Sequence, residues 1–186
     1  MLTEAQAQEE KVFQNSVAMT VTLIAFGMMF ATLFLGYFLV RSNSPMWPPV
    51  EIQNLPKLLP FLSTLIMGLS SLTYVLMERS AAKRSLYWSL TFALGVAFLV
   101  LQWILWGALK ANGILVSNGN VPSMVIAFTW IHAAHIVLAL IALAWLGRFV
   151  FIKKDELTVI KLMNVGKFWH FLGIIWLLIY LMMFVL

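Results

Sequence analysis

The sequence predicts an all-α integral membrane protein: a bundle of five transmembrane helices with a cytoplasmic N-terminus and the C-terminus outside. Three observations predict it. The chain contains five apolar stretches of at least 18 residues, none of them includes Asp, Glu, Lys or Arg, and the basic residues between them are unevenly distributed. Lipid offers the backbone no hydrogen-bond partner, so apolar runs long enough to cross a ~30 Å hydrocarbon core are expected to be helical.

The five predicted spans leave no room for a soluble domain between them. They are Val17–Val40, Pro60–Met77, Leu86–Leu109, Val121–Gly147 and Phe168–Leu186. Residues 1–16 are rich in Gln and Glu and lack the features of a secretory signal, so they predict a cytoplasmic lead to a bundle formed by residues 17–186. The mean hydropathy of +0.95 and the 10% charged content agree, since soluble domains carry about 25% charged residues.

The connections have distinct compositions. Ser42–Leu59 contains four prolines and predicts a stiff, extended loop, whereas Ser80–Ser85 predicts a tight basic turn. Lys110–Asn120 is rich in Gly and Asn, which is typical of turns. Lys153–Lys167 mixes polar and apolar residues and predicts a short helix at the membrane interface.

The basic residues predict the orientation of the bundle. Nine of the twelve lie in the three segments that share the side of the N-terminus, and the other three, Arg41, Lys57 and Lys110, lie opposite. Cytoplasmic loops are enriched in Lys and Arg, so the N-terminal side is predicted to be cytoplasmic. This placement favours a membrane surface over nucleic acid as the reason for the net charge of +5.

Small residues predict where the helices pack. Ser89, Ala93 and Ala97 recur every four residues, and Thr32 with Gly36 and Thr64 with Gly68 repeat the pattern. Membrane helices associate closely where small residues let their backbones approach.

Three histidines are the candidate functional residues within the spans. His132 and His135 are three residues apart and share a helix face, and His170 lies near the start of the last span. Two or three imidazoles can bind a metal or a haem, but no carboxylate or thiol is available at depth to complete or orient such a site. The alternative, which we favour, is a structural role in which each imidazole bonds a neighbouring helix or a buried water. His170, within Trp169-His170-Phe171, then forms the polar tip of an interfacial aromatic anchor.

Other chemistry has little support in the sequence. There is no cysteine, phosphate-binding loop or nucleophile–base pair, so we assign no catalytic, cofactor-binding or metal residues and no soluble substrate. Arg148, at the predicted cytoplasmic end of the fourth span, is a candidate partner for a lipid headgroup, because a guanidinium can bond a phosphate through two donors. The alternative is a solvated charge that only sets topology.

The order of five motifs, one per span, resembles subunit III of the haem–copper terminal oxidases, the cytochrome c oxidase subunit III family. The motifs are Tyr37-Phe38 through Arg41 to Trp47-Pro48-Pro49, Leu69-Ser70-Ser71-Leu72-Thr73, Leu86-Tyr87-Trp88 with the later Phe98-Leu99-Val100-Leu101-Gln102, His132-Ala133-Ala134-His135, and Trp169-His170-Phe171 with Trp176. Five spans resemble the short, prokaryotic form of this family. The chain departs from the family pattern at three positions where an intramembrane acid is usual: Phe26, Leu105 and Gly173 stand there.

The resemblance implies an accessory subunit in the prokaryotic cytoplasmic membrane, a non-catalytic part of an oxygen-reducing complex of aerobic respiration. It implies no cofactor in this chain, haem and copper in the partner subunits, contact with subunit I and other oxidase subunits, and bound phospholipid. The acids on which a proton-uptake role of the family would depend are missing at these three positions. Two alternatives stay open: a subunit III-like component of a nitric oxide reductase, and a small transporter or channel lined by His132, His135 and the hydroxyl groups of the second and third spans.

Overall fold

The computed structural model describes residues 4–49, 52, 55–152 and 156–185, and these form an all-helical bundle. Five long helices account for the bundle: α1 (Glu4–Ser42), α2 (Leu58–Arg79), α3 (Arg84–Ala111), α4 (Asn120–Ile152) and α5 (Glu156–Tyr180). Each is long and apolar enough to cross a membrane. Two short elements complete the fold: the 3₁₀ turn η2 (Val116–Asn118) and a terminal π-helical turn, η3 (Leu181–Val185).

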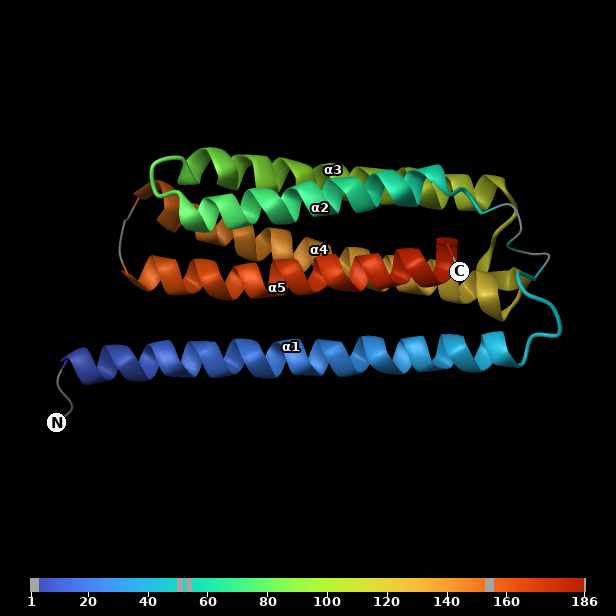
Figure 1. The fold of residues 1–186 in the computed structure, drawn as a ribbon, viewed down its shortest axis with the longest axis horizontal. Coiled ribbons are helices and arrows are strands. Elements are labelled where there is room, and N and C mark those ends of the chain that lie inside the picture. The colour runs from blue at the N-terminus through green and yellow to red at the C-terminus, as the bar shows by residue number, and fades with distance from the viewer. Residues whose placement is uncertain (1–3, 50–51, 53–54, 153–155, 186) are drawn as a thin grey trace.

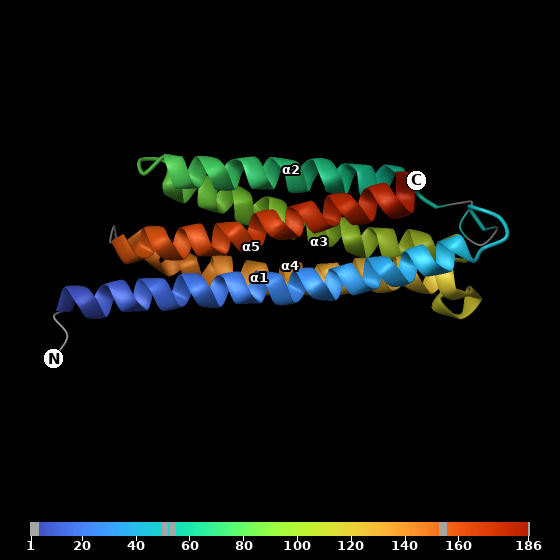
Figure 2. The ribbon, with the colours of Figure 1, turned by 60° about the horizontal axis from the view of Figure 1, so that its bottom comes forward.

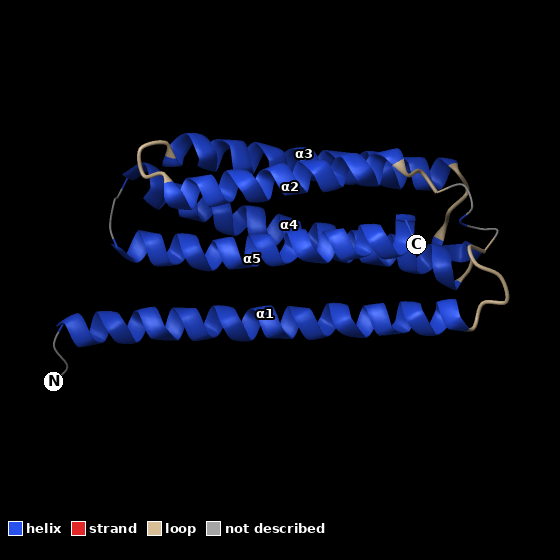
Figure 3. Ribbon diagram, in the orientation of Figure 1, coloured by secondary structure: helices blue, strands red, loops and turns tan. Residues whose placement is uncertain are grey.

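The helices run side by side and the connections gather at the two ends of the bundle (Figure 1; Figure 3). The N-terminus lies at one end and the C-terminus at the other, as an odd number of crossings requires. The basic residues Lys153 and Lys154, and Leu186 of the last predicted span, lie outside the described residues.

The helices extend beyond the predicted apolar spans. Helix α1 begins at Glu4, so most of the predicted lead is helical, because its Glu, Gln and Ala residues favour helix once a helix follows them. Within the segment predicted as a short interfacial helix, residues 156–167 are helical and form the first part of α5, which runs unbroken from Glu156 to Tyr180. The helix was predicted correctly, but its being a short helix of its own was wrong, because a change in polarity does not by itself interrupt a helix.

Helix α2 packs closely on α3, and α4 and α5 complete a four-helix group around a common interior. Helix α1 lies against this group, chiefly on α4 and α5 (Figure 2). Of the apolar, membrane-spanning part of α1, 11% is buried in the bundle, against 50% of the corresponding part of α4. Helix α1 is therefore the most peripheral of the five helices.

The close contacts differ from the predicted small-residue seam on α3. Ser89 and Ala93 are exposed, and the buried face of α3 contains Thr91, Gly95 and Phe98. A Cβ added at Gly95 would lie 2.7 Å from Cη2 of Trp169 and 2.8 Å from Cδ2 of Leu140. The backbone of α3 therefore approaches α4 and α5 at this glycine.

Aromatic side chains connect the helices through hydrogen bonds. The indole of Trp88 donates to the Leu143 carbonyl (2.9 Å), and that of Trp106 donates to the Thr129 hydroxyl (3.1 Å), so both join α3 to α4. Tyr74 of α2 donates to the Leu162 carbonyl of α5 at 2.8 Å. These bonds satisfy polar groups inside an apolar bundle, where a missing partner is costly.

Candidate functional site

His132 lies in the interior of the bundle with no exposed surface. Rings from three other helices surround it: Phe30 of α1 at 6.4 Å, Phe98 of α3 at 5.7 Å and Trp176 of α5 at 5.3 Å between centroids. Neither ring nitrogen has a hydrogen-bond partner in the structure. An apolar, aromatic environment thus holds an imidazole whose polar atoms are unsatisfied.

His135, one turn along α4, has a different environment. Its Nδ1–H donates to the Ile131 carbonyl of its own helix at 2.7 Å, and its side chain is 8% exposed. Phe26 of α1 meets the imidazole edge-on at 4.6 Å between centroids. The two histidines share the face expected from their spacing, and Phe30 of α1 lies beside both of them. Their other neighbours differ, because Phe26 of α1 covers His135 whereas α3 and α5 cover His132.

His170 does not join this pair. Its Nδ1 lies 3.2 Å from the hydroxyl of Ser71 on α2, and its ring meets Tyr74 edge-on at 5.6 Å. No group of three His, Cys, Asp or Glu residues that could hold a metal occurs in the described part of the chain. The three histidines therefore do not form a common ligand set.

Trp169 departs from the interfacial position predicted for it. Its side chain is fully buried, and its indole donates to the Ser70 hydroxyl at 3.2 Å. Trp176, two turns further along α5, donates to the Thr64 hydroxyl at 3.1 Å. Ser70 and Thr64 are six residues apart along α2, close to the seven residues that separate the two tryptophans along α5. The sequence analysis did not use this signal.

The three positions that lack the acids of the resemblance lie inside or between the helices. Phe26 packs on His135 and also stacks on Phe168 at 5.6 Å, and Leu105 is fully buried in α3. Gly173 faces α2, where an added Cβ would lie 3.3 Å from the Ser71 hydroxyl. Two aromatic or aliphatic side chains and a glycine thus occupy these places.

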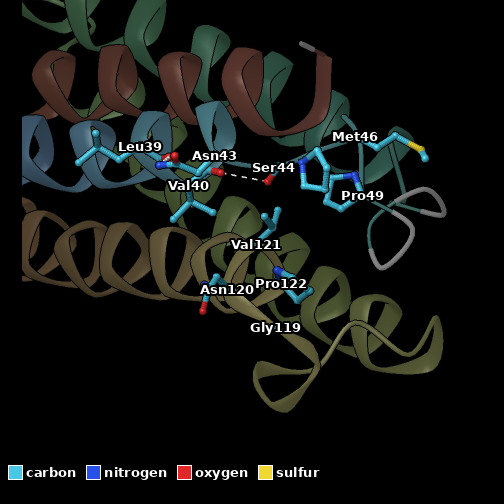
Figure 4. Close-up of a pocket in the computed structure, with 11 residues that line it drawn as sticks. Leu39, Val40, Asn43, Ser44, Met46, Pro49, Gly119, Asn120, Val121 and Pro122 are labelled. Carbon is cyan, nitrogen blue, oxygen red and sulfur yellow. Dashed lines mark hydrogen bonds between the residues drawn. The ribbon is translucent and has the colours of Figure 1, made fainter.

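Two grooves on the bundle were not predicted from the sequence. One, of about 640 Å³, lies at the end that carries the C-terminus, between the last residues of α1 and the start of α4 (Figure 4). Asn43, Ser44 and Asn120 line it together with apolar Val40 and Val121. The other, of about 360 Å³, lies between α2 and α5 beside Gly68, Gly173 and His170.

Arg148 is exposed near the end of α4 that lies opposite this first groove. Its neighbour Gly147 packs under Trp88, whose Cζ2 would lie 2.6 Å from an added Cβ. Close by on α5, the Lys161 ammonium lies 5.2 Å from the centre of the Trp145 ring. This end of the bundle combines the exposed Arg148 and the partly buried Lys161 with an aromatic surface.

The comparisons with known proteins agree on one family. The family model described as "Cytochrome c oxidase subunit III" matches residues 3–186. The cytochrome c oxidase subunit 3 of Synechocystis sp. is 24% identical over 177 residues, covering 88% of this chain and 72% of the relative. The cytochrome bo(3) ubiquinol oxidase subunit 3 of Buchnera aphidicola is 30% identical over 159 residues, covering 82% of this chain and 83% of the relative.

Proposed function

The chain belongs to the cytochrome c oxidase subunit III family and is an accessory subunit III of a haem–copper oxidase, and we propose that it serves this oxidase without a cofactor of its own. It packs against subunit I and other oxidase subunits, which hold the haem and copper, and stabilises them. The observation that carries the proposal is the extent of the family match, which covers all five helices and not one motif.

The construction of the bundle supports a scaffold role. Its interior polar groups are mostly used to join helices, as in the bonds from Trp169 to Ser70 and from Tyr74 to Leu162. Large apolar side chains remain on the surface, including Trp103 at 72% and Ile141 at 60% exposure. Such a surface suits lipid or the transmembrane helices of a partner.

Phospholipid binding has two sources of support. The groove of about 640 Å³ places the amide of Asn43 and the hydroxyl of Ser44 above apolar Val40 and Val121, an arrangement that suits the junction between a lipid headgroup and its chains. At the opposite end, the exposed Arg148 can reach a phosphate at headgroup depth.

The proposed location is the prokaryotic cytoplasmic membrane, with the N-terminus inside. The nine basic residues on the N-terminal side support this orientation. Cysteine residues introduced into the cysteine-free chain, one at Ser80 and one at Ser117, provide the test. An impermeant thiol reagent applied to intact cells should label only the variant at Ser117, and the reverse pattern would exclude the orientation.

Purification from native membranes tests the function. The tagged chain should co-purify with a haem-containing, oxygen-reducing subunit, and a tagged unrelated membrane protein should not. Recovery without any haem protein contradicts the proposal, and recovery with a nitric oxide-reducing subunit replaces the partner. Specific solute flux through the chain reconstituted alone in liposomes would favour a transporter instead.

A further inference from the structure

Three buried polar atoms without a hydrogen-bond partner belong to two side chains of adjacent helices. They are Oε1 of Gln102 on α3 and both ring nitrogens of His132 on α4. Both side chains have no exposed surface. In the described part of the chain, only Nε of Arg84 shares this condition. Buried polar groups in native proteins are nearly always paired, so this concentration calls for a partner.

The packing places the two side chains at the same level of the bundle. Gln102 lies one turn after Phe98 and one turn before Trp106, so all three occupy the same face of α3. Phe98 contacts the ring of His132, and Trp106 bonds Thr129, which precedes His132 by one turn on α4. Gln102 therefore lies between two contacts that bracket the Thr129–His132 segment.

The amide of Gln102 is satisfied on one side only. Its Nε2 donates to the Ser63 hydroxyl of α2 at 3.3 Å, which leaves Oε1 unpaired. Exchanging the amide nitrogen and oxygen does not remove the problem, because one of the two atoms then still lacks a partner. Gln102 alone therefore cannot satisfy its own hydrogen-bonding groups.

Two of the three unpaired atoms match the two hydrogen-bond donors of one water molecule. A neutral imidazole has one N–H donor and one bare nitrogen that accepts. The bare nitrogen and Gln102 Oε1 are both acceptors and cannot bond each other, whereas the two O–H groups of a water can bond both.

We propose that one internal water molecule lies between α3 and α4 and donates hydrogen bonds to Gln102 Oε1 and to the unprotonated ring nitrogen of His132. Together with the bond from Gln102 to Ser63, this water completes a polar layer that joins α2, α3 and α4 within the apolar interior. Buried waters of this kind typically satisfy otherwise unpaired groups and contribute to the fold. The inference does not depend on which oxidase the chain serves.

A cycle of variants tests the coupling between the two side chains. Four forms of the full-length chain are compared in lipid nanodiscs: the wild type, Gln102→Leu, His132→Leu and the double variant. Circular dichroism measures the loss of helix in each of them on heating. Each single variant leaves one hydrogen bond of the water unused and should lower the unfolding midpoint by roughly 2–8 °C. The double variant removes both acceptors, so its unfolding midpoint should fall by clearly less than the sum of the two single decreases. Losses that simply add contradict a shared water.

A matched control separates coupling from general softening of the bundle. Thr73 bonds Thr91 in the α2–α3 interface, about three turns of α3 away from Gln102. Gln102→Leu combined with Thr73→Val should therefore give additive losses. Coupling as large in this pair as in the Gln102–His132 pair would overturn the assignment.

Direct observation provides the second test and requires no variant. A cryo-electron microscopy map of the wild-type oxidase at a resolution that resolves ordered waters should show a density peak within hydrogen-bond distance of Gln102 Oε1 and of one His132 nitrogen. Continuous side-chain packing at this position without such a peak would overturn the proposal, even if the variants fail to fold.

Discussion

Phe26 of α1 lies edge-on against the imidazole of His135 on α4, with 4.6 Å between the ring centroids and an interplanar angle of 86°. Phe26 is also the position at which the subunit III resemblance leads us to expect a glutamate. The residue that replaces the acid therefore directly contacts one of the paired histidines. An aromatic contact therefore occupies the place where the resemblance implies a carboxylate.

This contact predicts that an acid restored at Phe26 will depend on His135. Phe26→Glu should destabilise the chain, because the carboxylate enters an apolar contact. The loss should be about 1–3 kcal/mol smaller with His135 present than in the His135→Leu background, since an imidazole can bond the carboxylate. Unfolding of the four variants in nanodiscs measures this difference. Equal losses in both backgrounds would show that the two side chains do not interact.

The paired histidines predict a structural effect that leaves the haem unaffected. Replacing His132 and His135 together with Leu should weaken the bundle or its attachment to the complex, because the imidazole of His132 and the bond from His135 to Ile131 are lost. The haem absorption spectrum of the remaining intact complex should be unchanged. A shifted or missing haem band in a complex that still contains the variant chain would contradict this prediction.

The close packing around Gly95 predicts that α3 cannot accept a larger side chain at this position without a loss of stability. Gly95→Ala places a methyl group 2.7 Å from Trp169 and 2.8 Å from Leu140, so it should cost about 1–3 kcal/mol through overpacking. Gly107→Ala on the same helix is the control, because no atom lies within 4 Å of its added Cβ. Alanine is the better helix former, so the control should be neutral or stabilising by up to about 1 kcal/mol. Thermal unfolding compares the two, and similar effects would argue against a close helix approach at Gly95.

Arg148 predicts a lipid effect that depends on its position. Arg148→Gln should reduce the anionic phospholipid that co-purifies with the complex, measured by mass spectrometry of the extracted lipid, while subunit composition stays constant. The near-surface charge contributes about 1 kcal/mol to such attraction. Lys110→Gln, an exposed cation at the other end of the bundle, is the control. Equal lipid loss in the two variants would show that Arg148 attracts lipid only through its positive charge and not through its position.

The sequence predicted the five helices correctly because an uncharged apolar run of this length has one stable backbone arrangement in lipid. It predicted the faces of those helices poorly. On α3, exposed Ser89 and Ala93 and buried Gly95 are all small, and in lipid both faces of a helix are apolar. Hydropathy alone therefore cannot distinguish the side that meets a neighbour from the side that meets a lipid chain.

The candidate site was likewise predicted only in part. The spacing of His132 and His135 predicted their shared helix face, but the side chains that surround each of them come from α1, α3 and α5. The buried position of Trp169 was missed because a tryptophan near a span end equally suits the interface. Its partner, Ser70, lies 99 positions away in the chain.

The peripheral position of α1 has a consequence for synthesis. Of the five helices, the ribosome makes α1 before the others, whereas its main neighbours α4 and α5 follow α2 and α3. During insertion, α1 must therefore wait in the bilayer while α2 and α3 associate beside it, with little of its own surface covered. Helix α1 thus precedes the other four helices in synthesis but completes its contacts only after α4 and α5 have been inserted.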